Sequence, residues 1–227
     1  MLRVGLTGDL GSGKSTVAAM FAARGAVVLS SDETARAMMQ RGESVYNVIV
    51  AQLGSEVVAA DGTLDRRKLA QMAFDPASPR VAELNAIIHP AVLAEQAKQV
   101  AAFAGTDKIV VVESALVFTV SAAGASAYGQ SAEQRRERFD RIVLVVASEA
   151  RKISRFVERV LGGRVPSAEE RVALEADARR RLALQDTESH AAECLVVRND
   201  GSLGELEAQV ESVWRELVDT LPPPSLR

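Results

Sequence analysis

The chain of 227 residues has little of several features that would assign it to a particular class of protein. It contains one cysteine, Cys194, so an intrachain disulfide cannot form, and the apolar residues 195–197 beside it favour an inert, buried thiol over a catalytic one. No apolar run reaches the ~18 residues that a membrane-spanning helix requires. The first strand begins too close to the N-terminus to leave room for a signal peptide. We therefore expect a cytoplasmic protein without membrane contact.

A large excess of one charge is missing as well. The chain has 27 Lys and Arg against 30 Asp and Glu, a formal net charge of −3, which argues against a broad nucleic-acid surface. A local basic cleft for an anionic small molecule is still compatible with this composition. With 48% hydrophobic and 25% charged residues, the chain is expected to be globular, and its length allows one α/β domain with a substantial core.

One short stretch carries the clearest chemical pattern. Residues 8–15 read GDLGSGKS and match the phosphate-binding pattern G-x-x-x-x-G-K-[ST] without a mismatch. Lys14 would reach the β- and γ-phosphates of a nucleotide, and the Ser15 hydroxyl would complete the coordination of Mg²⁺. Three glycines allow backbone N–H groups to turn toward a polyphosphate: Gly8, Gly11 and Gly13.

The alternative for this stretch is a plain glycine turn with a solvated lysine. However, residues 2–29 place an apolar strand before the loop and a helix after it, and phosphate binding uses the N-terminus of such a helix. This context leads us to predict nucleotide binding.

Apolar runs predict a parallel sheet. Besides the first strand, four buried strands are expected, at residues 27–29, 109–112, 142–146 and 195–197. Helical segments separate them, and a strand–helix–strand unit of this kind crosses over with the right-handed sense. The sequence therefore predicts a three-layer α/β fold, with a five-stranded parallel sheet flanked by helices.

Two segments interrupt this alternation. Residues 42–105 carry no strand signal, and periodicity predicts helices at residues 34–40, 45–53, 65–74, 81–88 and 91–103, with a break at 75–79. This helical insertion is a candidate acceptor-binding region. Residues 119–139 are expected to form a mobile connection, whereas residues 222–227 are expected to be a frayed tail.

Later helices are rich in arginine. We expect one helix at residues 149–161, a glycine break, and a second helix opened by a capping box of Ser167 and Glu170. Such a hinged pair is compatible with a closing lid, and equally with two ordinary surface helices. Arg155 is the strongest candidate for contacting phosphates because it is nearest the carboxyl end of the sheet. An amphipathic helix at residues 203–220 closes the chain.

Two acids follow predicted strands, at the edge of the sheet where ligands bind in open α/β folds. Asp32 is a candidate general base or a ligand for water on Mg²⁺. An equally good explanation is a helix N-cap, which Ser30, Ser31 or Asp32 could each supply. Glu113 suits the outer sphere of Mg²⁺. It is also compatible with simple solvation.

Two features of the insertion have both a structural and a functional interpretation. Arg66, Arg67 and Lys68 lie near a helix start, where the helix dipole does not favour cations, so an anionic partner or a solvated face could explain them. His89, which precedes Pro90, is more often a structural histidine than a catalyst in such a setting.

Several stretches occur in a characteristic order: GLTGDLGSGKST at 5–16, an Asp after the second strand, DGTLDRR at 61–67, LNAIIHP at 84–90 and RNDG at 198–201. In this combination the chain resembles the dephospho-coenzyme A kinase family over nearly its whole length. The resemblance implies transfer of the γ-phosphate of ATP to the ribose 3′-hydroxyl of dephospho-CoA, with ATP and Mg²⁺ as cofactors. It also implies a P-loop core, a helical acceptor domain and a small lid.

The resemblance implies roles for single residues. Asp32 would be the general base, while Lys14 and Arg155 would act on the phosphates and Ser15 would bind the metal. The acceptor would be bound by Asp32, Arg66, His89, Pro90 and Glu113. ATP would be held by Gly8, Gly11, Ser12, Gly13, Lys14, Ser15 and Thr16, with Asn199 near the adenine. Arg181 and Gln185 match an R-x-x-x-Q pattern at the return of the lid.

The chain also departs from the family pattern. Relatives usually carry Asp-Ala-Asp where this chain has Ser30-Ser31-Asp32, and Val-Pro-Leu-Leu-Phe-Glu where it has residues 114–119. Residues 121–138 are longer than is usual. Asp9 replaces the usual glycine beside the phosphate-binding amides, so its carboxylate must point away from ATP or weaken ATP binding.

We predict a single kinase domain over residues 1–227, as a monomer or small homo-oligomer. Its core covers about 1–40, 106–150 and 190–220, its acceptor-binding insertion about 41–105 and its lid about 151–188. The substrate is a small molecule, without nucleic acid. Two alternatives stay open: a P-loop kinase of another nucleotide or nucleoside, and a non-catalytic, ATP-binding regulatory paralogue.

Overall fold

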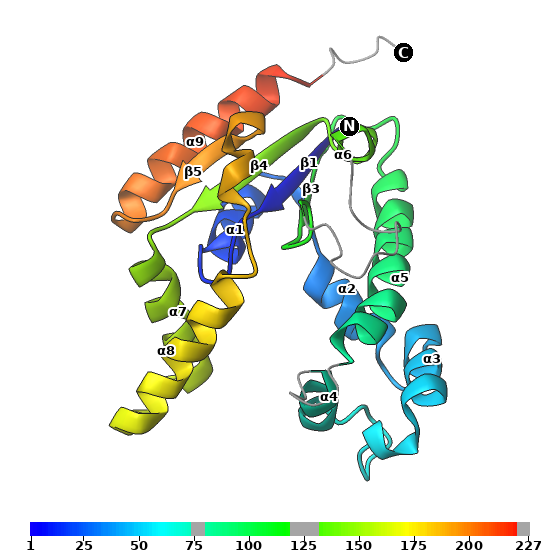
Figure 1. Cartoon of the computed structure of the whole chain (residues 1–227). Coiled ribbons are helices and arrows are strands. Elements are labelled where there is room, and N and C mark those ends of the chain that lie inside the picture. The colour runs from blue at the N-terminus through cyan, green and yellow to red at the C-terminus, as the bar shows by residue number, and fades with distance from the viewer. Residues whose placement is uncertain (74–79, 119–131, 222–227) are drawn as a thin grey trace. The chain divides into compact units, whose positions relative to one another are not determined.

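A computed structural model of the chain describes residues 1–73, 80–118 and 132–221 (Figure 1). The strands are β1 (Leu2–Thr7), β2 (Val27–Ser30), β3 (Ile109–Glu113), β4 (Arg141–Val146) and β5 (Leu195–Arg198). The α-helices are α1 (Lys14–Ala23), α2 (Ser31–Met38), α3 (Ser44–Leu53), α4 (Arg66–Ala73), α5 (Val81–Ala101), α6 (Ala132–Arg138), α7 (Glu149–Leu161), α8 (Ala168–Leu182) and α9 (Leu203–Asp219). Two short 3₁₀ helices complete the described elements, η1 (Ser55–Val57) and η2 (Glu188–Glu193).

The strands form the predicted sheet, in the order β2-β3-β1-β4-β5. β1 pairs in parallel with both β3 and β4, and β4 pairs in parallel with β5. The predicted five-stranded parallel sheet flanked by helices is therefore confirmed. The chain builds the β2–β3 side first and then crosses to β4 and β5, so the strand order reverses at β1. In open α/β sheets, ligands bind at the carboxyl ends of the strands at this reversal.

A hydrophobic core fixes both ends of the predicted phosphate loop. Alternate residues of β1, among them Val4 and Leu6, are fully buried against Phe21 of α1 and Val210 of α9. Each such side chain contributes about 1.5–3 kcal/mol when it is buried. Because β1 precedes the loop and α1 follows it, this packing holds the loop between two anchored elements.

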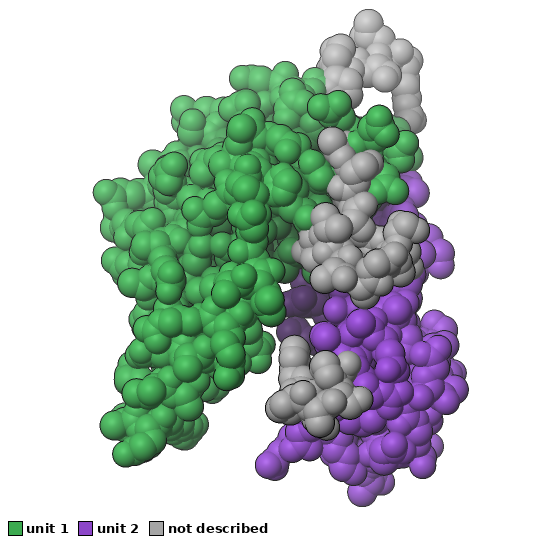
Figure 2. All heavy atoms as spheres, viewed as in Figure 1, with its two compact units in different colours: residues 1–28, 103–120, 129–227 green, residues 29–102, 121–128 purple. Residues whose placement is uncertain are grey.

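The chain divides into two compact units (Figure 2). The described residues of unit 1 are 1–28, 103–118 and 132–221, which include most of the sheet, whereas those of unit 2 are 29–73 and 80–102. Unit 2 has its own core, in which Ile49 of α3 packs with Leu69 of α4 and Leu84 of α5. Among the described helices of both units, none combines the length and the apolar character needed to cross a membrane.

Four predictions of local structure need correction. The helix expected at 34–40 begins at Ser31, because the Ser30 hydroxyl accepts a hydrogen bond from the backbone N–H of Glu33 at 3.4 Å and caps the helix earlier. The helices expected at 81–88 and 91–103 are one helix, α5, with Pro90 inside it. Pro90 removes only its own backbone hydrogen bond, and buried residues on both sides of it hold the helix together.

The third correction concerns the connection expected at 119–139, whose residues 132–138 form α6. Arg135 of this helix is buried and forms an ion pair with Glu193 at 3.0 Å. The capping box expected at Ser167 is only half formed: its hydroxyl accepts from the backbone N–H of Glu170, but the Glu170 carboxylate pairs with Arg164 at 2.7 Å. The break at 75–79, residues 119–131 and the tail at 222–227 lie outside the described residues.

Candidate functional site

The phosphate loop follows the carboxyl end of β1 and leads into α1. Its glycines adopt positive φ angles that other residues rarely adopt, +149° at Gly8, +72° at Gly11 and +100° at Gly13. Space is short as well, since a Cβ at Gly8 would lie 2.2 Å from the carbonyl oxygen of Val145. A Cβ at Gly13 would lie 2.1 Å from the amide nitrogen of Asn199. Glycine is therefore required here by both strain and space.

The start of α1 has the features of an anion site. In the described residues, no side chain caps this helix at Gly13, and its first turn contains no acid. The hydroxyls of Thr7 and Ser12 are buried, and neither has a hydrogen-bond partner among the described residues. Uncapped backbone N–H groups and unsatisfied buried hydroxyls are groups that a bound polyphosphate can satisfy. The loop therefore fits a polyphosphate on its own geometry.

The side chain of Lys14 folds back over the phosphate loop. Its Nζ donates hydrogen bonds to the carbonyl oxygens of Gly8 at 2.8 Å and Asp9 at 3.1 Å. An ammonium group in this place supplies positive charge for phosphate oxygens. Thr16, also predicted to bind the nucleotide, is exposed, and its backbone N–H donates to the carbonyl of Gly13 at 3.1 Å.

The side chains of Ser15 and Glu113 are in contact beside the loop, so both could lie next to one Mg²⁺ ion. The Ser15 hydroxyl donates to Oε1 of Glu113, the last residue of β3, at 2.8 Å. In the part of the chain that the structure describes, no cluster of three or more His, Cys, Asp or Glu side chains could hold a metal. Mg²⁺ usually takes only one or two protein oxygens and fills its octahedron with water and phosphate oxygens. Ser15 and Glu113 fit that pattern.

Arg155 and Asn199 brace the backbone of the loop. One Arg155 nitrogen, Nη2, donates to the backbone carbonyl and the side-chain oxygen of Asn199, at 2.9 and 3.1 Å. The other, Nη1, lies 3.3 Å from the carbonyl of Ser12 and 3.4 Å from that of Gly11. The buried amide of Asn199 donates to the Ser12 carbonyl at 2.8 Å. Its predicted adenine contact stays a prediction, because the side chain already holds the loop.

The carboxylate of Asp9 turns toward α7 and is buried. It accepts hydrogen bonds from Lys152 at 2.6 Å and from the hydroxyl of Thr187 at 2.6 Å. Burial alone would raise the pKa of Asp9, but these hydrogen bonds outweigh it and hold the pKa below its usual value. Burial alone would likewise lower the pKa of Lys152, but its bonds to Asp9 and Glu188 raise it. Both groups are therefore charged at neutral pH.

Asp32 lies in the first turn of α2, in unit 2, and its side chain is exposed. Its alternative role as the helix N-cap is wrong, because Ser30 fills that position. Ser31 is buried, and its hydroxyl accepts a hydrogen bond from the amide of Gln96 in α5 at 2.9 Å. The two serines therefore cap and anchor the turn that presents Asp32.

Arg66 is the first residue of α4, also in unit 2. Asp65 caps this helix by accepting hydrogen bonds from the backbone N–H groups of Arg67 at 3.0 Å and Lys68 at 3.1 Å. Arg66 lines a small hollow of about 190 Å³ whose other walls are Met39, Gln40, Thr63 and Leu64. An exposed guanidinium at such a hollow is suited to bind an anionic group.

His89 and Pro90 lie in the middle of α5 and are half-buried. Burial lowers the pKa of His89, so its neutral form is favoured at physiological pH. A neutral, half-buried imidazole is suited to shape a site and not to supply charge. Of the predicted residues, the structure thus brings Lys14, Ser15, Glu113, Arg155 and Asn199 together in unit 1. Asp32, Arg66, His89 and Pro90 belong to unit 2.

The sequence reasoning missed Lys152 and Thr187. Lys152 lies on the apolar face of α7, which also buries Ile153, Phe156 and Val157. A lysine at helical spacing within such a face needs a buried partner, and Asp9 was already an unusual residue of the loop. The two signals together could have found the pair. Nothing in the local sequence of Thr187 marks its role.

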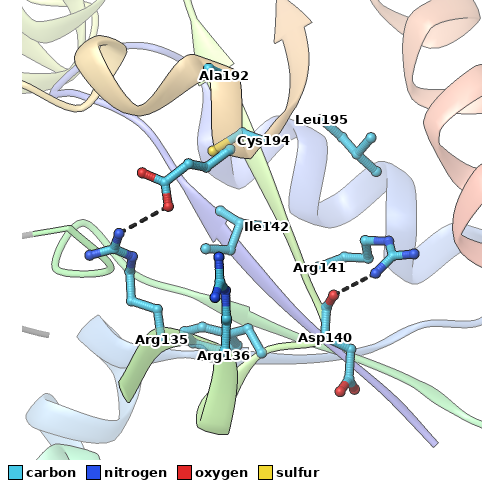
Figure 3. A pocket seen from close by; sticks show the side chains of 10 residues that line it. Arg135, Arg136, Asp140, Arg141, Ile142, Ala192, Cys194 and Leu195 are labelled. Atoms are coloured by element: carbon cyan, nitrogen blue, oxygen red, sulfur yellow. Dashed lines mark hydrogen bonds and ion pairs between the residues drawn. The ribbon is translucent and has the colours of Figure 1, made fainter. Parts of the chain in front are cut away.

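A hollow of unit 1 lies at the amino ends of β4 and β5, where Arg141, Ile142 and Leu195 line it (Figure 3). Its volume is about 530 Å³. A smaller hollow of about 380 Å³ lies beside Asp9, and Lys152 and Gln185 also line it. Arg135 and Glu193 on the walls of the larger hollow pair with each other. Burial and the neighbouring Glu193 raise the pKa of Cys194 to about 12, which agrees with the predicted unreactive thiol, although the side chain is only half-buried.

Comparison with known proteins places these features in a family. Residues 2–205 match the family model described as dephospho-CoA kinase. A protein named dephospho-CoA kinase from Streptomyces avermitilis is 35% identical over 219 residues, covering 96% of this chain and 95% of its own. A protein of the same name from Leifsonia xyli is 37% identical over 220 residues, covering 96% and 99%.

Solved structures agree with the fold. A crystal structure from Thermus thermophilus superposes with a TM-score of 0.65 and 27% identity, covering 95% of this chain and 97% of that one. A structure of a dephospho-CoA kinase from Campylobacter jejuni has a TM-score of 0.56 and 16% identity, covering 95% and 96%. At that identity the second similarity concerns the fold alone.

Proposed function

Because the chain belongs to the dephospho-CoA kinase family, we propose that it transfers the γ-phosphate of ATP to the ribose 3′-hydroxyl of dephospho-CoA, giving CoA and ADP. The observation that carries this proposal is the loop at residues 8–15, whose Lys14 and paired Ser15 and Glu113 suit a polyphosphate with Mg²⁺. The family supplies the acceptor, which the loop alone does not specify.

On the donor side, the loop and the start of α1 bind the phosphates of ATP. Lys14 neutralises charge on the β- and γ-phosphates, while Ser15, with Glu113 next to it, would hold Mg²⁺. Mg²⁺ would neutralise charge that develops on the transferred group. Arg155 keeps the loop carbonyls of Gly11 and Ser12 turned away from the phosphates and so leaves the N–H groups facing them.

On the acceptor side, Asp32 accepts the proton of the 3′-hydroxyl as its oxygen attacks the γ-phosphorus. The bond from that phosphorus to the bridging oxygen breaks, and ADP leaves with the electron pair. Arg66 binds an anionic group of dephospho-CoA, and His89 with Pro90 shapes the pocket. In this scheme residues 41–105 form the acceptor-binding region and residues 151–188 the lid of one kinase domain, acting in the cytoplasm.

A coupled assay tests the proposal. Full-length protein with ATP, Mg²⁺ and dephospho-CoA should release ADP, and mass spectrometry with nuclease mapping should place the new phosphate on the 3′-oxygen. A panel of nucleoside monophosphates and nucleosides serves as the control. Faster ADP release with a panel member would favour a kinase of another nucleotide. ATP binding without transfer to any acceptor would favour a regulatory protein.

A further inference from the structure

Three consecutive residues of the phosphate loop are held by the α7–α8 hairpin, here residues 149–182, and by the segment that follows it. The backbone N–H of Leu10 donates to Oε1 of Gln185 at 2.8 Å, and the Leu10 side chain packs into the α7–α8 core. A Cβ at Gly11 would lie 2.2 Å from the carbonyl oxygen of Lys152, so backbone packs directly against backbone there. Asp9 forms the third contact.

The contact of Asp9 is a closed polar network. Its Oδ2 accepts from the Lys152 ammonium at 2.6 Å and its Oδ1 from the Thr187 hydroxyl at 2.6 Å. The three residues are 7%, 6% and 7% exposed. Lys152 also donates to Glu188 at 2.6 Å, but the Glu188 side chain is 52% exposed, so its carboxylate is solvated by water. Lys152 therefore carries the buried positive charge that compensates Asp9.

Because this network lies beside the phosphate loop, it affects both the shape of the loop and the charge near a bound nucleotide. Asp9 lies next to Gly8, whose carbonyl binds Lys14, so any shift of Asp9 moves the amides that would face the phosphates. An uncompensated carboxylate at this position would also repel a polyphosphate. Lys152 is on the same helix as Arg155, which braces the next loop carbonyls, so α7 holds the loop at two successive points.

We propose that Lys152, Asp9 and Thr187 are positioning residues that hold the phosphate loop in its nucleotide-binding shape and cancel the charge of Asp9. The proposal rests on the proposed function only in that ATP is the nucleotide. In this proposal α7, the first helix of the predicted lid, is fixed to the phosphate loop. A substitution in α7 therefore alters nucleotide affinity even though the substituted residue does not contact the nucleotide.

The test compares the single variants Lys152→Met and Asp9→Asn with the double variant. Lys152→Met leaves the Asp9 carboxylate buried without its cation, so KM for ATP should rise about tenfold while KM for dephospho-CoA is unchanged. Asp9→Asn keeps an acceptor for Thr187 and should have a smaller effect. In the double variant the charge is gone, and KM for ATP should return to near the Asp9→Asn value.

A pH profile provides a readout that lost stability alone would not give. In Lys152→Met, lowering the pH from 7 to 5 should protonate Asp9 and restore ATP affinity relative to the double variant. The other charged groups that line the hollow beside Asp9 are the same in both variants, so their contributions cancel in the comparison: Glu149, Arg179, Asp186 and Glu188. Asp140→Asn, which breaks an ion pair of unit 1 away from the loop, is the matched control and should leave KM for ATP unchanged.

Calorimetry with Mg²⁺ and the β,γ-imido analogue of ATP separates this proposal from the proposed function, since it needs no acceptor. If Lys152→Met does not fold, Thr187→Val replaces it, because it removes only the hydroxyl donor. Two results would overturn the proposal. One is that the effects of Lys152→Met and Asp9→Asn on KM for ATP add up in the double variant; the other is that KM for ATP in Lys152→Met is no higher than in Asp140→Asn. An affinity for the analogue that decreases from wild type to Asp9→Asn to Lys152→Met would support the proposal even if dephospho-CoA is not the acceptor.

Discussion

The two units present their candidate residues in opposite ways. In unit 1, Lys14, Arg155 and Asn199 are tied to carbonyl oxygens of the phosphate loop. In unit 2, Asp32 and Arg66 are exposed in the first turns of their helices. The residues proposed to act on ATP are thus held in place by the protein itself, whereas the residues proposed to act on the acceptor extend into solvent. Preorganised dipoles reduce the cost of binding a polyphosphate, so changes to these loop contacts should alter stability and ATP affinity together. Changes at Asp32 and Arg66 should alter catalysis or acceptor affinity alone.

The largest effect is expected at Asp32. In the proposed mechanism Asp32→Asn removes the proton acceptor while keeping the shape of the side chain, so kcat should fall about 10²–10⁴-fold. Because the side chain is exposed, the melting temperature and the affinity for ATP should stay as in the wild type. Steady-state kinetics and calorimetry measure these quantities. Glu33→Gln in the same exposed turn is the control, and an Asp32→Asn enzyme with wild-type kcat would rule out the base role.

Gly11 tests the donor side. In Gly11→Ala the new Cβ meets the Lys152 carbonyl at 2.2 Å, so the loop must shift, and kcat/KM for ATP should fall about 10²-fold. Gly25→Ala is the matched control, because Gly25 also has positive φ, +98°, but nothing lies within 4 Å of its Cβ. It should lose only about 1–2 kcal/mol of unfolding free energy to backbone strain. Equal kinetics for the two variants would mean that the loop is not held by α7.

The sheet could be predicted from the sequence because its signals are local. Runs such as Ile109–Val112 are apolar without interruption, which is typical of parallel strands buried on both faces. The phosphate loop was equally local, since the pattern fixes which residues face the ligand. The prediction that the helix breaks at Pro90 was wrong, because the packing of α5 within unit 2 outweighs the local effect of proline.

The candidate site was harder to predict where it depends on contacts between distant parts of the chain. Asp9 and Lys152 are 143 residues apart, and no local pattern pairs them. The same holds for Asn199, whose amide reaches Ser12 across 187 residues. Sequence reasoning identified which residues carry suitable chemistry, but buried partners of this kind arise from the topology that brings β1, α7 and β5 to one edge of the sheet.

A smaller effect is expected at Arg66, on the acceptor side. Arg66→Gln removes the charge-assisted contact that we propose with the acceptor, so KM for dephospho-CoA should rise about tenfold, within the range known for hydrogen bonds to charged groups. KM for ATP should not change. Initial rates over a matrix of both substrates separate the two constants. Arg67→Gln is the matched control in the same turn of α4. A common rise in both constants would instead mean that Arg66 supports the fold of unit 2.

The smallest effect concerns pH and stability, and it compares an ion pair from each unit. Arg3 of β1 donates to Asp140, just before β4, at 2.8 Å from its backbone and at 2.7 Å from its guanidinium. Burial alone would raise the pKa of Asp140, but the bonds from Arg3 outweigh it and lower the pKa. A carboxylate with a lowered folded-state pKa contributes stability above its unfolded pKa, and the contribution is lost as the pH falls through the folded-state value.

Urea unfolding at pH 7 and pH 3 should therefore show that Asp140→Asn costs about 1 kcal/mol or less at pH 7, because the pair is partly exposed, and still less at pH 3. The comparison pair in unit 2 is Arg80 with Glu83, three residues apart at 2.7 Å on an exposed helix end. Glu83→Gln should change the midpoint less than Asp140→Asn does, because the Arg80 pair lies within one helical turn whereas the Arg3 pair joins β1 to the residue just before β4. An equal loss in both variants would mean that the ion pairs of unit 1 stabilise it no more than local pairs stabilise unit 2.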